Sequence, residues 1–192
     1  GRQRVITRKI LVEQIRRKLA GGNVPNNFAI TELEVGKQVD QVANEVIYIR
    51  CADDGAWDNF LTTYENVPIT LDSAKALYYF EIPRVIGFKN QQGVFQVSSM
   101  KDQESIFMPL SANGQWLYQN INEVLEGCVG YYNDQKRVYL VNYNPATNTD
   151  NLLVKLVVDR SELDEEADYQ ITPEVQKLIL RETVNFFQPQ SK

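Results

Sequence analysis

Apolar residues recur at helical spacing near the start of the chain. Leu11, Ile15 and Leu19 follow one another at every fourth position, which predicts a helix over residues 7–20. Two glycines come directly after it. Glycine adopts the left-handed backbone that commonly ends a helix, so we expect the helix to stop there.

A second helix is predicted over residues 31–50. Thr31 and Glu34 match a capping box, in which each side chain accepts a hydrogen bond from a free amide of the first turn. The apolar positions after it alternate spacings of four and three: Val35, Val39, Val42, Val46 and Ile49. Such a narrow stripe is typical of a helix that packs against another helix. Gly36 lies inside the stripe and indicates close helix approach.

A third helix is predicted near the end of the sequence. Thr172 is a good N-cap, and Pro173 suits the first helical position because its missing N–H needs no partner there. Pro189 is expected to end the helix. Its predicted apolar face consists of Val175, Leu178, Ile179 and Phe186.

The middle of the chain favours β-structure, because β-branched and aromatic residues dominate several short runs. The predicted strands are 76–82, 85–88, 94–97, 128–132, 137–143 and 152–158. Turn signals separate them, which predicts an antiparallel meander. One helix is expected inside it, with Leu117, Ile121, Val124 and Leu125 on one face. We interpret residues 51–75 as loop with a short helix.

These elements predict an α+β fold in one domain, residues 1–192. Residues 1–50 and 171–187 would form a small helical bundle, and residues 76–158 an antiparallel β-rich insertion. The length of 192 residues, with 43% apolar and 23% charged residues, is ordinary for one globular domain. The longest apolar stretch, 152–158, is too short to cross a membrane, and the basic N-terminal segment lacks the apolar core of a secretory signal.

The charge is unevenly placed along the chain. Residues 1–18 carry seven basic side chains against Glu13 alone, although the whole chain has a net charge of −5. Residues 159–168 carry six acidic side chains against Arg160 alone. Opposite patches in one chain indicate two different partners or head-to-tail contact between copies, and a solvated helix face and loop are the alternative. The candidate interface residues are Arg8, Arg16, Arg17, Lys18, Glu162, Asp164, Glu165 and Glu166.

The sequence offers little for catalysis. It contains no histidine and only two cysteines, Cys51 and Cys128, which we expect to be reduced and buried. This composition removes histidine-based triads and four-thiolate zinc sites, and no phosphate-binding glycine motif occurs. Asp53 and Asp54 could hold Mg²⁺, yet a solvated turn is the more ordinary interpretation. We therefore expect no enzyme activity, no cofactor and no metal.

Contact with nucleic acid is a second use for the basic segment. Arg2, Arg4 and Arg8 could touch DNA phosphates without reading sequence. Trp57 and Trp116 could stack on bases, but no basic cluster surrounds either of them in the sequence, which favours a core or interface role.

The order of helices resembles a known family. A short helix with a Gly-Gly stop (residues 9–22), a valine-striped helix (31–50) and a proline-initiated last helix (171–187) are similar to the head-to-tail connector proteins of short-tailed bacteriophages. The ring or neck proteins of crAss-like phages are the most similar. The resemblance covers about 70 residues at the two ends, and no residue role is carried over.

The resemblance implies a structural subunit of the virion. Its fold would be a bundle of terminal helices with a β-rich insertion. Its partners would be eleven further copies in a twelve-membered ring, the portal and other connector or tail proteins, with non-specific contact to packaged DNA in the ejection channel. The protein would be made in the host cytoplasm and end in the neck or tail. The alternatives are a non-catalytic regulatory module that binds another protein, and a carboxylate-metal hydrolase.

Overall fold

The chain divides into two compact units. The computed structural model describes residues 5–88, 93–110, 128–148 and 150–188. One unit joins the two ends of the chain, Gly1–Phe60 with Asp159–Lys192, and is here called the helical unit. The other, Leu61–Val158, is called the β unit. The mixed α+β class, with terminal helices and a β-rich middle, is confirmed.

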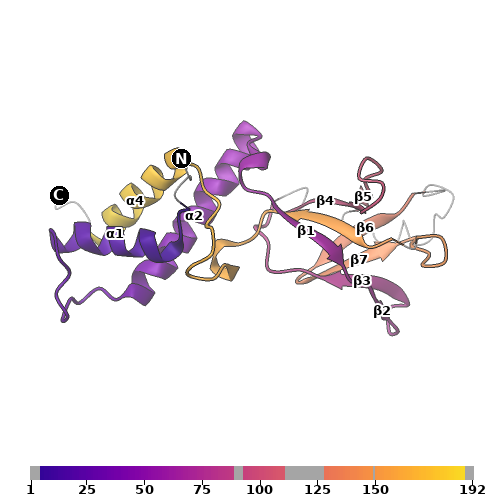
Figure 1. Cartoon of the computed structure of the whole chain (residues 1–192), viewed down its shortest axis with the longest axis horizontal. Coiled ribbons are helices and arrows are strands. Elements are labelled where there is room, and N and C mark those ends of the chain that lie inside the picture. Colours follow the sequence, from indigo (N-terminus) through magenta and orange to yellow (C-terminus); the bar gives the residue numbers. More distant parts are fainter. Residues whose placement is uncertain (1–4, 89–92, 111–127, 149, 189–192) are drawn as a thin grey trace. The chain divides into compact units, whose positions relative to one another are not determined.

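Three helices form the helical unit within the described residues: α1 (Arg8–Ala20), α2 (Glu32–Asp54) and α4 (Pro173–Phe187). Each of them packs against the other two (Figure 1). The predicted starts are confirmed by their caps, since Thr7, Thr31 and Thr172 each accept a hydrogen bond from a first-turn amide. The helix α2 runs four residues further than predicted and ends at Gly55 in the left-handed conformation.

The buried stripe of α2 differs from the predicted one. Val35, Val39 and Val42 are buried as expected, but Val46 is only half-buried and Ile49 is 53% exposed. Burial passes instead to the neighbouring positions, Ala43, Ile47 and Cys51. A straight helix has 3.6 residues per turn, so a stripe spaced at 3.5 rotates away from its partner along the helix. The spacing therefore predicted the buried residues correctly from Val35 to Val42 and wrongly at Val46 and Ile49.

The apolar face of α4 also needs one correction. Val175 and Ile179 are buried, and Thr183 continues the same line one turn later. Phe186, predicted on this face, is 59% exposed and makes an edge-to-face contact with Phe187. Phe186 lies on the same side of the helix as positions 175, 179 and 183, but it lies in the last turn of α4, beyond Thr183, the last buried position of the helix.

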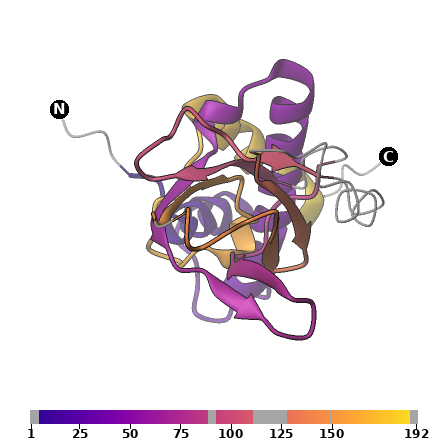
Figure 2. The same cartoon turned by 90° about the vertical axis from the view of Figure 1, so that its right-hand side faces the viewer.

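Two sheets form the β unit (Figure 2). The first has the order β1-β8-β4 and the second β2-β3-β7-β6-β5. The strands are β1 (Thr62–Val67), β2 (Thr70–Asp72), β3 (Leu77–Glu81), β4 (Val94–Ser99), β5 (Met108–Pro109), β6 (Gly130–Asp134), β7 (Arg137–Val141) and β8 (Leu152–Leu156). All neighbours pair antiparallel except β5 with β6.

The predicted meander is wrong in its connections. Among the described strands, only β2–β3 and β6–β7 are hairpins between consecutive strands, whereas β1 and β4 both pair with the distant β8. Residues 62–72, predicted as loop, contain β1 and β2. In the predicted strand 85–88, Val85 makes only an isolated bridge to Val158. Local composition does not encode strand partners that lie far away along the chain.

The two sheets lie against each other within the β unit. The hydroxyl of Tyr131 in β6 donates to the carbonyl of Val94 in β4 at 3.5 Å. The segment before β5 also joins them, because Phe107 N donates to Val97 O and Met108 N to Val129 O, both at 2.8 Å. Between the sheets the core is apolar and includes Phe80 and Leu140.

Several predicted features lie outside the described residues. They are the helix with Leu117, Ile121, Val124 and Leu125, most of the turn at 89–93, and Pro189. Arg2, Arg4 and Trp116 lie outside them too.

Candidate interface surfaces of the helical unit

Helix α1 carries most of the predicted basic interface residues, and its two caps determine where these residues lie. The helix begins at its N-cap Thr7, whose hydroxyl accepts from Ile10 N at 3.3 Å. It ends where the amides of Gly21 and Gly22 donate to the carbonyls of Lys18 and Arg17, at 3.3 and 3.0 Å. Cations in this last turn are favourable because the helix dipole is negative there. Arg17 and Lys18 therefore lie in the capped last turn of α1.

Arg8 points inward. Its side chain is 12% exposed, and Nε donates to Asp40 Oδ1 at 2.9 Å. A second guanidinium nitrogen donates to the carbonyl of Arg160. The structure thus places this predicted interface residue between α1, α2 and the segment that follows residue 158. Its contacts are internal to the unit.

Asp40 and Tyr169 extend this buried polar network. The Tyr169 hydroxyl donates to Asp40 Oδ1 at 2.6 Å, and the guanidinium of Arg8 lies 5.9 Å from the Tyr169 ring centre. Tyr169 is fully buried, and this burial raises the pKa of its hydroxyl far above the ordinary value. Tyr169 therefore stays neutral, and its hydroxyl donates a hydrogen bond to the carboxylate of Asp40. No local sequence pattern indicates this network, because its members are far apart along the chain.

Arg160 is the largest fully buried side chain among the described residues. Its Nη2 donates to the carbonyls of Gln170 at 3.3 Å and Phe60 at 3.5 Å. Burial lowers the pKa of this guanidinium. It also raises the pKa of the neighbouring Cys51 thiol to about 11. Arg160 thus anchors the segment that follows the β unit to the helices, a role its sequence context did not indicate.

Arg16 is half-buried and bonded within the unit, whereas Arg17 is exposed. Arg16 is 18% exposed; it donates to Ile30 O at 3.2 Å and pairs with Glu32 at 3.1 Å. It therefore fastens the loop between α1 and α2. Arg17 is exposed and pairs with Glu13 one turn earlier. Lys18 is exposed at the end of the helix.

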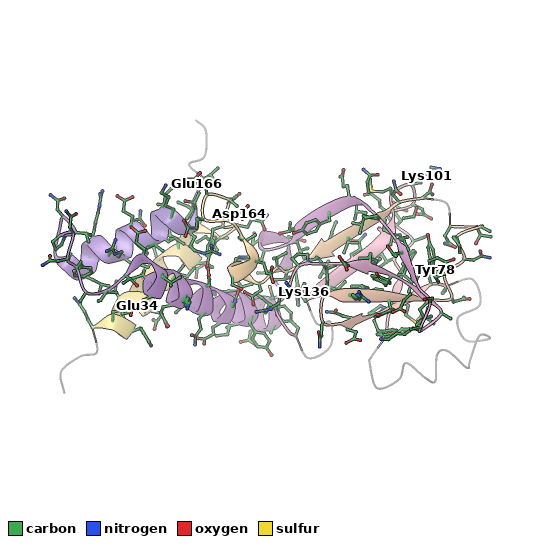
Figure 3. The ribbon with its side chains drawn as sticks, turned by 90° about the horizontal axis from the view of Figure 1, so that it is seen from below. Glu34, Tyr78, Lys101, Lys136, Asp164 and Glu166 are labelled. Atoms are coloured by element: carbon green, nitrogen blue, oxygen red, sulfur yellow. The ribbon has the colours of Figure 1, made fainter. Side chains whose placement is uncertain are left out.

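The acidic residues follow a short 3₁₀ helix, η3 (Arg160–Glu162). Asp159 caps it by accepting from Ser161 N at 2.9 Å and from Asn44 at 2.8 Å. Glu162 is half-buried in η3, whereas Asp164, Glu165 and Glu166 are exposed. Figure 3 shows Asp164 and Glu166 on this segment.

The basic and acidic segments meet inside one chain. The amide of Lys9 donates to Glu165 O at 3.2 Å, and its ammonium pairs with Glu166 at 3.1 Å. The ion pair raises the pKa of Lys9, but both side chains are mostly exposed. An exposed pair of this kind is screened by solvent and contributes little to stability. The acidic segment is thus held at the N-terminal end of α1 by its backbone more than by its charges.

A cleft of about 580 Å³ lies between α1 and α2. Its lining contains both acids and bases, among them Glu13, Glu32 and Asp40 with Lys9 and Lys37. Opposite charges at such short spacing compensate one another. This cleft therefore presents no single charge to a ligand.

The predicted carboxylate pair lies at the end of α2. Asp53 and Asp54 are both exposed, and Asp54 pairs with Arg50 at 3.0 Å. Arg50 also pairs with Glu174, which ties the end of α2 to the start of α4. In the described part of the chain, no group of three or more metal-binding side chains comes together. No described helix is long and apolar enough to cross a membrane.

The remaining residues considered from the sequence are the two cysteines and Trp57. Cys51 is buried as expected, whereas Cys128 is exposed, so the expectation of burial is wrong there; both are free thiols. Cys128 lies next to the start of β6 rather than inside the sheet. Trp57 is half-buried in the 3₁₀ helix η1 (Trp57–Asn59).

Comparison with models of protein families gives no match to this sequence, and comparison with curated proteins gives none either.

Proposed function

We propose that this chain is a structural subunit of a virion head-to-tail connector ring, which assembles below the portal and lines or supports the DNA channel. The observation that carries the proposal is the way the helical unit is built. Its helices come from both ends of the chain, and the β unit is inserted between Phe60 and Asp159. This arrangement is the one that the resemblance to phage connector proteins implies.

The surface of the helical unit adds a second argument. Copies in a ring meet through two different patches, one on each side of every subunit. Exposed cations lie at the C-terminal end of α1, and exposed carboxylates lie on residues 164–166. Two patches of opposite charge on one unit supply the asymmetry that a ring requires.

The experiment that tests this function is a mass measurement of the assembled state. The purified chain, alone and mixed with the portal protein of the same virus, would be measured by native mass spectrometry. We expect a closed oligomer, twelve copies by resemblance, at least in the presence of the portal. Mass spectrometry of purified virions should also detect the chain. A chain that stays monomeric in both mixtures and is missing from virions would contradict the proposal and favour a regulatory binding module.

A further inference from the structure

An open groove runs along α1 and α4 on the helical unit. It consists of two adjoining hollows of about 460 and 310 Å³, which share Lys18, Lys177 and Leu180. A hydrogen bond of 3.4 Å from Gln176 to Gln14 bridges the two helices beside it. We call this surface the α1–α4 groove.

The α1–α4 groove carries one sign of charge. Arg17, Lys18, Lys177 and Arg181 line it and are exposed, and no acidic side chain is among its lining residues. Arg17 and Arg181 pair with glutamates of their own helices. For Lys18 and Lys177 the described residues provide no ion pair or side-chain hydrogen bond. The groove therefore offers at least two uncompensated cations, unlike the mixed lining of the α1–α2 cleft.

Apolar side chains also line this groove. Leu180 and Val184 are half-buried between the cations. A phosphate backbone would gain from the cations but not from aliphatic side chains. A peptide segment that carries both carboxylates and an apolar residue would use both features.

The chain itself contains such a segment. In residues 162–168 the acids surround Leu163, which is half-buried, and Asp164, Glu165 and Asp168 are exposed. Figure 3 shows Asp164 and Glu166 on this segment, near the start of α1. The hydrogen bond from the amide of Lys9 to the carbonyl of Glu165 holds the segment there. Lys9 and Lys18 are nine residues apart, about 13 Å along a helix, so the carboxylates held beside Lys9 lie away from Lys18 of their own chain.

We propose that the α1–α4 groove binds the acidic segment 162–168 of a second copy of this chain. The contact joins two different surfaces, so it repeats head-to-tail from copy to copy and closes when the rotation allows. This inference rests on the proposed ring function and names the surfaces through which the subunits meet. Lys18 and Lys177 contact the carboxylates, and Leu163 packs on Leu180 and Val184.

Isotope-labelled cross-linking tests the contact directly. Full-length ¹⁴N and ¹⁵N protein are mixed, assembled with and without the portal protein, and treated with a carbodiimide, which couples an ammonium to a carboxylate in direct contact. We expect mixed-isotope peptides that join Lys18 or Lys177 to residues 162–168. An assembled oligomer without such peptides would overturn the groove contact and leave the ring function standing.

Charge reversal then measures the contribution of the contact. We expect Lys177→Glu to weaken self-association about tenfold, because it replaces an attraction by a repulsion. Glu165→Lys should do the same, and the two changes in one chain should restore association to within about threefold of wild type. Lys37→Glu is the matched control, an exposed lysine of the same unit outside the groove, and should change association less than twofold. Unchanged melting temperatures would show that the variants fold.

The remaining outcomes are also decisive. Mixed-isotope cross-links in a complex that never closes on the portal would support the groove contact and contradict the ring. A wild-type chain that is monomeric throughout would overturn both. Binding of duplex DNA that Lys177→Glu weakens, without mixed-isotope cross-links, would overturn the contact in favour of phosphate binding.

Discussion

The helical unit and the β unit stabilise their interiors in different ways. In the helical unit, Arg8, Asp40, Tyr169 and Arg160 form a buried or nearly buried polar network between helices and the 159–170 segment. In the β unit, the described core between the sheets is apolar, with Ser98 as its buried polar residue. Its tyrosine–carboxylate hydrogen bond, from Tyr139 to Asp72 at 3.0 Å, lies on the opposite face of β7 from Leu140. Helices can slide and rotate against one another, so directional polar contacts help to fix their register. In a sheet, the hydrogen bonds between backbones already fix the register of neighbouring strands.

The largest test of this comparison is a charge placed in the helical core. Val42→Asp puts an unpaired carboxylate at a position that is 6% exposed, and we expect it to destabilise the fold by about 3–5 kcal/mol. Hydrogen exchange should show that the amides of α1, α2 and α4 lose protection, whereas the amides of the β unit keep theirs. Ile49→Asp on the same helix is the control and should change the free energy of unfolding by less than about 1 kcal/mol. Equal effects of the two changes would mean that α2 does not bury its valine stripe.

The second test compares one glycine from each unit. Gly93 has φ of 79°, and a Cβ there would lie 2.3 Å from Ile86 O, so Gly93→Ala should destabilise by about 2–4 kcal/mol. A Cβ at Gly36 would lie 3.8 Å from Arg8 Cδ and Val12 Cγ2, which is ordinary contact. Gly36→Ala should therefore stabilise by about 1 kcal/mol. Thermal unfolding measures both, and a destabilising Gly36→Ala would show that the helices pack more closely there.

The third test removes one hydroxyl from each unit. Tyr169→Phe deletes the donor to Asp40 and should destabilise by about 2 kcal/mol, because bonds to charged groups are the stronger ones. Tyr143→Phe deletes a donor to the neutral carbonyl of Asn148, at 2.9 Å, and should change stability by about 1 kcal/mol or less. Urea unfolding of both variants ranks them. The opposite ranking would remove the polar network as the distinguishing feature of the helical unit.

The smallest expected effect is on alkaline stability. Burial raises the pKa of Tyr131 in the β unit from 10.0 to about 12. Between these values the unfolded chain releases a proton that the folded chain retains, so the stabilising contribution present below pH 10 is lost as the pH rises. We expect Tyr131→Phe to reduce the fall in unfolding free energy across this window by about 1–2 kcal/mol. An unchanged pH profile would show that Tyr131 does not titrate in this way.

The sequence predicted local structure better than connections. Helix starts followed from caps such as Thr31 with Glu34, whose hydrogen bonds span three residues and are encoded locally. The pairing of β1 and β4 with β8 joins residues far apart along the chain, and no local pattern encodes it. The contacts of Arg8 are non-local in the same way, because its partners Asp40 and Arg160 lie 32 and 152 residues away. The charge of a residue is visible in the sequence, but its partner is not.

The discontinuous helical unit has a consequence for synthesis on the ribosome. Helices α1 and α2 emerge from the ribosome early. Ile179 of α4 is synthesised roughly 120 residues after Phe60. At about 5–20 residues per second, α1 and α2 wait roughly 6–24 s for their third partner. Throughout this time the face of α2 that α4 later covers remains exposed to other chains. A cell that makes many copies at once would therefore gain if a chaperone held the nascent chain, or if the β unit folded first and brought the two ends together.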